Sequence, residues 1–238
     1  MVVETTIDSC MECPTRRTTE WQVLGDCELA QVDAAKRAMT YQPGETLFAQ
    51  GDPGRGVFCI KSGLIGVRRV DVHGNSVLLR LSSAGSTIGY RTFLTREAHA
   101  NSAEVLTASV VCYIPRPQVE KLLKASPLLG ERFLQHFTRD AIALENDYVR
   151  SLTMGMKSRF LHIMLVFYER YGYQDENGNA TMELPVRRGE LAEMVGVRPE
   201  SISRLIDKLQ TDNVMTFDDR RVQISDIGEI LQQVGATV

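Results

Sequence analysis

Residues 184–208 read LPVRRGELAEMVGVRPESISRLIDK, and the order of apolar and polar residues in this stretch predicts the fold of the C-terminal part of the chain. Leu191, Met194 and Val195 are spaced to lie on one face of a short helix. Gly196 suits the left-handed backbone in which helices commonly end, and Pro199 suits the first position of a second helix. The pattern predicts two short helices joined by a tight turn, which is a helix-turn-helix.

The second predicted helix, residues 199–209, has an apolar inner face and a polar outer face. The DNA major groove admits one α-helix, in which arginine can donate two hydrogen bonds to guanine and glutamate can accept one from cytosine. The candidate DNA-binding residues are Arg188, Arg198, Glu200, Ser201, Ser203, Arg204 and Lys208. The alternative interpretation is an ordinary helical hairpin whose polar face is solvated.

Residues 214–217 and 222–224 form two short apolar runs around the polar turn DDRR. Such runs predict a β-hairpin. A hairpin directly after a recognition helix makes the domain a winged helix, and Arg220 and Arg221 would lie where a wing contacts phosphates.

The run PESISRLIDKLQ, preceded by LAEMVGV and followed by the hairpin, resembles the recognition helix of the cyclic-AMP receptor/FNR superfamily of bacterial transcription regulators. Glu200, Ser203 and Arg204 are similar to the FNR and FixK branch of that superfamily. The resemblance implies a homodimeric regulator, most often an activator. It also implies binding to double-stranded DNA at a two-fold symmetric operator with TTGA-type half-sites.

Composition is that of a globular protein with room for two modest domains: 238 residues, 43% hydrophobic and 24% charged. There is no apolar run of about 20 residues and no signal-peptide pattern, so we expect a cytoplasmic protein without a membrane segment. From residue 151 onward, ten Lys and Arg stand against thirteen Asp and Glu. This balance is atypical of a nonspecific polyanion binder, and it favours base reading by a few well-placed arginines.

Residues 41–114 consist of short β-branched and aromatic runs separated by Gly-containing turns about every ten residues. This spacing predicts a sandwich or barrel. The order PGETLF, QGDPGRGVFCIKSG, IGVRRV, DVHGN, AGSTIGY resembles the double-stranded β-helix of the cyclic-nucleotide-binding fold.

The expected fold class is therefore α+β, with a cyclic-nucleotide-binding-like barrel, a long dimerisation helix and a C-terminal winged helix-turn-helix. The expected segments are a Cys-containing N-terminus (1–25), a sensory barrel (26–125), the dimerisation helix (126–153) and the DNA-binding domain (154–238).

Barrels of this geometry also occur in cupin enzymes, which hold a metal with clustered histidines. The four histidines here include no H-x-H pair, and the chain has no G-x-S-x-G, Walker or H-E-x-x-H motif. We therefore expect no enzymatic activity.

Cyclic AMP is not the expected ligand of the barrel. In the cyclic-AMP branch, the phosphate-binding cassette carries a glutamate and, about ten residues later, an arginine, and here those positions hold Tyr90 and Asn101. Without the arginine, the phosphodiester lacks its bidentate charge partner. A different ligand in the barrel remains open.

The cysteines supply a second candidate sensor. Cys10 and Cys13 form a C-x-x-C pair, whose thiolates can reach one metal or cluster. By resemblance, Cys112 stands where the FNR branch places its barrel ligand, while the usual third N-terminal ligand is missing. Cys27 could complete a four-thiolate site for a four-iron iron–sulfur cluster if its helix turn swings toward Cys112. Alternatively, Cys10 and Cys13 are a redox pair or have no such role, and Cys59 is expected to be a small buried apolar residue.

The candidate metal-ligating residues are thus Cys10, Cys13, Cys27 and Cys112. The expected signal is oxygen, redox state or a related cue, and the alternative is a small organic effector bound in the barrel without a cluster.

Residues 126–152 predict one long helix that starts at Ser126-Pro127. The alternating four- and three-residue spacing of its apolar positions is that of a coiled-coil seam. The candidate dimer residues are Phe137, Ala141, Leu144 and Tyr148. The alternative is a helix buried within a single chain. By resemblance, the loops 52–55 and 95–99 match places where the family contacts RNA polymerase.

Overall fold

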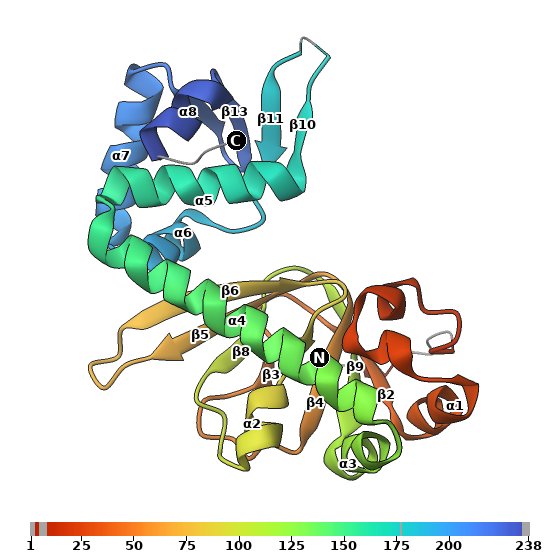
Figure 1. Ribbon diagram of the computed structural model, residues 1–238. Coiled ribbons are helices and arrows are strands. Elements are labelled where there is room, and N and C mark those ends of the chain that lie inside the picture. Colours follow the sequence, from red (N-terminus) through yellow and green to blue (C-terminus); the bar gives the residue numbers. More distant parts are fainter. Residues whose placement is uncertain (1–2, 5–8, 177, 235–238) are drawn as a thin grey trace. The chain divides into compact units, whose positions relative to one another are not determined.

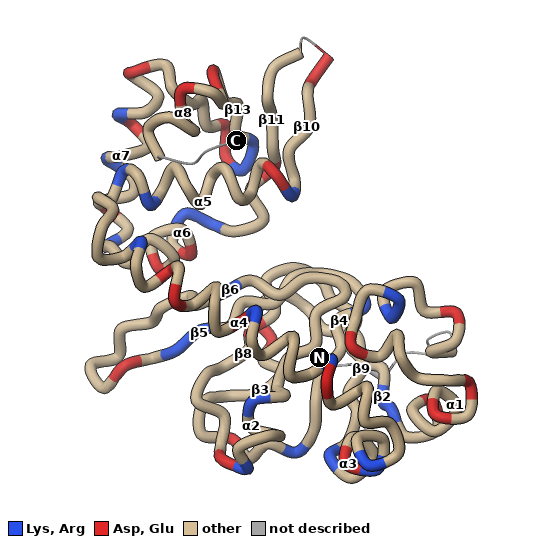
Figure 2. The backbone as a smooth tube through the Cα atoms, viewed as in Figure 1, with Lys and Arg blue, Asp and Glu red and all other residues tan. Residues whose placement is uncertain are grey.

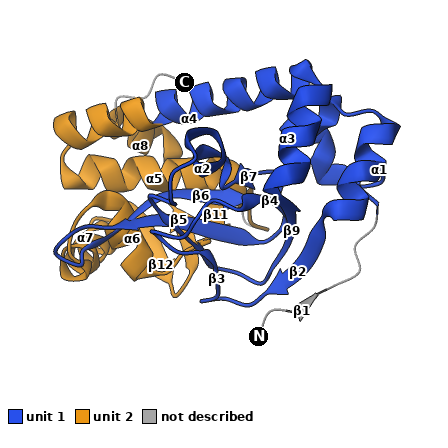
Figure 3. Ribbon diagram, turned by 90° about the horizontal axis from the view of Figure 1, so that it is seen from below, with its two compact units in different colours: residues 1–143 blue, residues 144–238 orange. Residues whose placement is uncertain are grey.

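The computed structural model describes residues 3–4, 9–176 and 178–234 (Figure 1). The chain divides into two compact units, residues 1–143 and residues 144–238, coloured separately in Figure 3. We call them the N-terminal unit and the C-terminal unit. The division falls inside the long helix α4 (Pro127–Thr153).

The N-terminal unit contains two antiparallel sheets. The first has the spatial order β1 (Val3–Glu4), β2 (Arg37–Tyr41), β9 (Ser109–Pro115), β4 (Gly56–Ser62) and β7 (Thr87–Ile88). The second has the order β3 (Thr46–Phe48), β8 (Ser102–Val105), β5 (Leu64–Val70) and β6 (Ser76–Ser83). Both sheets contribute to one buried cluster that fills the barrel: Tyr41, Phe48, Phe58, Ile60, Ile65, Ile88, Ala103, Val105 and Val111.

The apolar run at residues 104–114 is divided between two strands in different sheets. β8 ends at Val105 and β9 begins at Ser109. Between them, the Leu106 amide donates to the Leu64 carbonyl at 2.9 Å, which marks the corner where the chain leaves one sheet for the other. Residue alternation has the same period on both sides of such a corner and therefore does not reveal it.

Helices cover one side of the first sheet. They are α1 (Asp26–Ala35), α3 (Arg116–Ala125) and the start of α4, together with the 3-10 helices η1 (Pro14–Thr18) and η2 (Glu20–Val23). A second buried cluster joins them to the strands and includes Trp21, Leu29, Val32, Leu122, Leu129 and Phe133. A further short helix, α2 (Tyr90–Thr95), follows β7. The two 3-10 helices lie within the Cys-containing N-terminal segment, residues 1–25.

The C-terminal unit begins within α4 and continues with α5 (Met156–Tyr171). Its four-stranded sheet has the order β10 (Gly172–Gln174), β11 (Ala180–Glu183), β13 (Arg221–Ile224) and β12 (Met215–Asp218). The remaining helices are α6 (Arg188–Val195), α7 (Pro199–Thr211) and α8 (Ile227–Val234). The predicted hairpin is β12–β13. β10, which pairs with β11, was not predicted.

Candidate DNA-binding surface and thiol pocket

The turn between α6 and α7 has the geometry that its sequence predicts. Gly196 has a φ of +74°, and its amide donates to the Ala192 carbonyl at 2.9 Å, which closes α6. Pro199 starts α7, where its missing amide donor costs no hydrogen bond. A side chain at residue 196 would be strained at this φ, so the glycine sets the angle at which the two helices meet.

Packing fixes the orientation of α7. The four apolar residues of its inner face are at most 5% exposed: Ile202, Leu205, Ile206 and Leu209. The opposite face therefore points outward. Glu200, Arg204 and Lys208 are exposed. Ser201 and Ser203 are half-buried, and the Ser203 hydroxyl donates to the Pro199 carbonyl at 3.2 Å.

Further basic side chains lie on the elements that precede and follow α7 in the chain. Arg188, in the first turn of α6, and Arg198, which precedes α7, are both exposed. Figure 2 marks the Lys and Arg positions along the backbone in blue. In the wing, Arg221 is exposed, whereas Arg220 is half-buried and its Nε donates to the Leu184 carbonyl at 3.0 Å. Arg220 thus fastens the wing to the segment that leads into α6.

The apolar stripe of α4 is solvent-exposed beyond its first turns. Its own chain buries Leu129 and Phe133. Farther along the helix, Phe137 is 42%, Leu144 38% and Tyr148 66% exposed, with Ala141 half-buried between them. Other exposed apolar residues of the helix widen the stripe: Leu134, Ile142, Val149 and Leu152. Exposed leucine, phenylalanine and tyrosine on one helix indicate a surface that associates with a partner.

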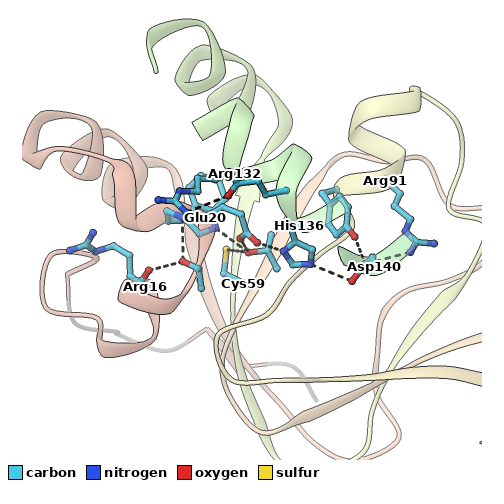
Figure 4. A network of polar contacts seen from close by, with 12 residues as sticks. Arg16, Glu20, Cys59, Arg91, Arg132, His136 and Asp140 are labelled. Atoms are coloured by element: carbon cyan, nitrogen blue, oxygen red, sulfur yellow. Dashed lines mark hydrogen bonds and ion pairs between the residues drawn. The ribbon is translucent and has the colours of Figure 1, made fainter. Parts of the chain in front are cut away.

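A polar network ties the N-terminal segment to α4 (Figure 4). Glu20 of η2 is only 7% exposed; it contacts His136 Nδ1 of α4 and accepts a 2.8 Å hydrogen bond from the Thr87 hydroxyl. The Trp21 indole donates to the same hydroxyl at 3.1 Å. The Cys59 sulfur lies 3.9 Å from it.

On its other side, His136 Nε2 is 3.8 Å from Asp140, one helical turn later. Asp140 also contacts Arg80 of β6 and the Tyr90 hydroxyl, and Arg91 approaches it at 3.4 Å. The network fixes the first half of α4 to the barrel.

The carboxyl pKa values in the network respond to two opposing effects. Burial by itself would raise the pKa of Glu20, but the hydrogen bond and charge of His136 outweigh it and hold that pKa below the ordinary glutamate value. Burial would also raise the pKa of Asp140, but the hydrogen bond from the Tyr90 hydroxyl and the charge of Arg80 outweigh it and lower that pKa. Both carboxyl groups are therefore ionised at neutral pH, and their contribution to stability is lost on acidification.

We expect the N-terminal unit to lose stability as the pH falls below about 4.3, the ordinary glutamate pKa, through the lowered value of Glu20. Glu20→Gln should lower the free energy of unfolding at pH 7 by about 1–3 kcal/mol, because it removes a buried charged hydrogen-bond partner. The same substitution should also make the free energy of unfolding depend less on pH below about 4.3. Denaturant unfolding followed by the fluorescence of Trp21, the single tryptophan, measures both. Glu12→Gln, at an exposed acid in the same segment, is the control, and equal acid dependence in all three proteins would contradict the assignment.

Four cysteines from three segments of the chain line one pocket of the N-terminal unit. They are Cys10 and Cys13 of the N-terminal segment, Cys59 of β4 and Cys112 of β9. Cys27, the predicted fourth ligand, is exposed in the first turn of α1 and does not line the pocket. The structure thus brings together three of the four predicted cysteines and adds Cys59, which was expected to be only a buried apolar residue.

Four cysteine thiols are the kind and number of ligands that bind a structural zinc ion or an iron–sulfur cluster. Among the described residues, however, no three Cys, His, Asp or Glu side chains are already arranged around one point as a metal site. Burial raises the pKa values of the Cys10, Cys59 and Cys112 thiols, that of Cys10 to about 12. These three are therefore neutral thiols at pH 7 in the absence of a cation.

Tyr90 and Asn101 stand at the two positions that the resemblance assigns to phosphate binding in the cyclic-AMP branch. Tyr90 is 1% exposed, and its hydroxyl contacts Asp140. Asn101 carries a buried Oδ1 with no hydrogen-bond partner among the described residues. A phenol and an amide at these two places offer no cation for a phosphodiester.

The loops 52–55 and 95–99 lie side by side. The Gly51 amide donates to the His99 carbonyl at 2.7 Å, and the His99 amide donates to the Asp52 carbonyl at 2.8 Å. Pro53 and Ala98 form an isolated antiparallel bridge. The two segments make one continuous surface.

Comparison with known proteins matches both units. The family model described as "Cyclic nucleotide-binding domain" matches residues 38–126, and the one described as "Crp-like helix-turn-helix domain" matches residues 158–232. The "Fumarate and nitrate reduction regulatory protein" of Vibrio cholerae serotype O1 is 23% identical over 235 residues, which is 96% of this chain and 91% of the relative. The "Transcriptional activator protein FnrL" of Cereibacter sphaeroides is 24% identical over 240 residues, 98% of this chain and 94% of the relative.

Solved structures agree on the fold. FixK2 from Bradyrhizobium japonicum superposes with a TM-score of 0.75 at 16% identity, covering 86% of this chain and 100% of that one. A CRP/FNR family regulator from Thermus thermophilus has a TM-score of 0.69 at 20% identity, covering 83% of this chain and 98% of that one.

A barrel of the cyclic-nucleotide-binding type followed by a long helix and a Crp-like helix-turn-helix defines a class of DNA-binding transcription regulators. The chain belongs to the CRP/FNR family of transcription regulators. The predicted family and α+β fold class are confirmed, and so is the expectation that the protein is not an enzyme, since the matched family consists of regulators. Among the described residues, no helix is long and apolar enough to cross a membrane.

Proposed function

We propose that the protein is a homodimeric transcription activator that binds a two-fold symmetric operator with TTGA-type half-sites and responds to an oxygen or redox signal. The observation that carries the DNA-binding part is the burial of the whole apolar face of α7, which leaves Glu200, Arg204 and Lys208 exposed on the opposite face. The Glu200, Ser203, Arg204 pattern supports TTGA-type half-sites.

Two recognition helices of a dimer enter successive major grooves about 34 Å apart, so operator binding requires two copies of α7. The apolar stripe on α4, formed by exposed Phe137, Leu144 and Tyr148 with half-buried Ala141 between them, supports a dimer in which this helix pairs with its symmetry mate. The surface made by residues 52–55 and 95–99 is the proposed contact with RNA polymerase.

A gel shift tests the operator. We expect the protein to shift a duplex with inverted TTGA half-sites at a concentration about 10³-fold or more below that needed for a scrambled duplex of the same length, the usual margin of specific over nonspecific binding. The assay is run at fixed salt, because nonspecific binding depends steeply on it. Equal shifts of both duplexes would contradict the proposal.

The sensing part is supported by the pocket of Cys10, Cys13, Cys59 and Cys112 and by the network beside it. Thr87 contacts the Cys59 sulfur and hydrogen-bonds Glu20, which in turn contacts His136 of α4. A change at the pocket therefore has a short polar route to the proposed dimer helix, whose packing sets the spacing of the two DNA-reading helices. Such an effector acts by favouring the arrangement that binds DNA.

A small organic effector is the second candidate signal, and one observation favours it. A separate pocket of about 480 Å³ is lined by aromatic residues and two arginines, among them Phe48, Phe58, Tyr113, Arg37 and Arg55. That volume and lining suit a small aromatic or anionic molecule. Operator binding that is independent of metal and changes with such a compound would favour this second candidate.

A further inference from the structure

Cys59 and Cys112 are direct partners in the antiparallel pair β4–β9. Residues paired in this way have Cα atoms about 4.5–5.5 Å apart and side chains on the same face of the sheet. Both side chains line the same pocket, which faces the N-terminal segment. The sheet therefore presents two thiols side by side to the C-x-x-C turn.

The C-x-x-C turn is held against these strands by α1. Asp33 accepts hydrogen bonds from the Ser9 hydroxyl at 2.6 Å and from the Cys10 amide at 2.8 Å. Lys36 bridges Asp33, at 2.6 Å, and the Cys10 sulfur, at 3.2 Å. The Arg16 Nε donates to the Cys10 carbonyl at 2.9 Å. Cys10 and Cys13 are thus placed by a dedicated set of contacts.

The pocket also has suitable charge and space. Lys36, Lys61 and Arg16 line it, and no Asp or Glu is among the described residues that do so. A divalent centre bound by four thiolates carries a net charge of about −2, which such cations offset. The cavity volume is about 50 Å³, several times the 10–15 Å³ that a single water needs.

Cys27 shares none of these features. It lies in the exposed first turn of α1, where its sulfur is 3.9 Å from the side-chain nitrogen of Gln31. α1 turns Leu29 and Val32 inward, toward the pocket, and leaves Cys27 in solvent. Bringing Cys27 to Cys112 would require unpacking these two residues.

We infer that Cys10, Cys13, Cys59 and Cys112 form one four-thiolate site for a soft metal centre, with Cys59 and not Cys27 as the fourth ligand. Each thiol releases its proton to solvent as it binds, so the affinity for metal rises with pH. Four thiolates suit either an iron–sulfur cluster or a single Zn²⁺. The inference deepens the sensing part of the proposed function and is independent of the DNA-binding part.

The full-length chain is reconstituted in two arms without oxygen: ferrous iron with sulfide, and Zn²⁺ alone. Bound metal per protomer is measured by elemental analysis, and the iron arm is also followed by thiolate-to-iron absorbance. The inference expects a stoichiometric centre in one arm, which identifies the metal. Cys59→Ser should weaken its retention about tenfold or more against a competing chelator, whereas Cys27→Ser should retain it as the wild type does.

Trp21 fluorescence checks that the variants fold, and Cys59→Ala replaces Cys59→Ser if the serine variant does not. A wild type that binds metal in neither arm overturns the inference. So does a Cys59 variant that retains the centre as tightly as the wild type, and so does loss of the centre in Cys27→Ser. Gel shifts of the same preparations on the TTGA duplex are scored separately, so a protein that binds metal but no operator contradicts only the DNA-binding proposal.

Discussion

Tyr148→Asp is expected to turn the dimer into a monomer at concentrations where the wild type is fully dimeric. Tyr148 is 66% exposed on α4, in line with Phe137, Ala141 and Leu144. In the proposed seam, an aspartate at this position is an unpaired charge removed from water, which costs about 3 kcal/mol or more. Each 1.4 kcal/mol is tenfold in affinity, so the dimer dissociation constant should rise at least about 100-fold.

Sedimentation at a fixed protein concentration measures the change. Asn146→Asp is the matched control, because it adds the same charge to the same helix turn on the face opposite the seam. We expect the control to remain dimeric. A dimer that is unaltered in Tyr148→Asp would refute the seam. The monomeric variant should also lose the operator shift, since one recognition helix reads only one half-site.

Arg204→Ala is expected to cost about 1–3 kcal/mol of operator affinity and to relax the preference for guanine in the half-site. The side chain is exposed on the outer face of α7, one turn after Glu200, while its neighbours Leu205 and Ile206 are buried. Folding should therefore be unaffected. The measurement is a gel shift on the TTGA duplex and on duplexes in which that guanine is replaced.

Lys208→Ala provides the comparison, since it removes an exposed positive charge one turn farther along the same helix. If Lys208 contacts phosphate, its loss should weaken binding about equally on every duplex and reduce the salt slope by about one. An Arg204→Ala protein that keeps the wild-type ranking of duplexes would show that Arg204 does not read a base.

Local sequence patterns were enough to predict the order of the barrel, the long helix, the helix-turn-helix and the wing. Apolar periodicity located α7 and its buried face, Gly196 located the end of α6, and Ser126-Pro127 located the start of α4. These signals are local, because helix faces and turns depend on residues a few positions apart. The resemblance of the α7 region and the barrel region gave the family from the same local patterns.

Which distant side chains meet could not be predicted from these local patterns, because it depends on long-range packing. The pairing of Cys59 with Cys112 depends on the register of β4 against β9, and nothing near either residue in the chain specifies that register. The same holds for Glu20 and His136, which lie 116 residues apart and meet where Trp21 and Phe133 pack edge to face. Cys27 is the next thiol along the chain after the C-x-x-C pair, but the packing of Leu29 and Val32 turns it outward. Local sequence patterns predict the secondary structure of a segment, whereas long-range packing determines which residues of other segments it contacts.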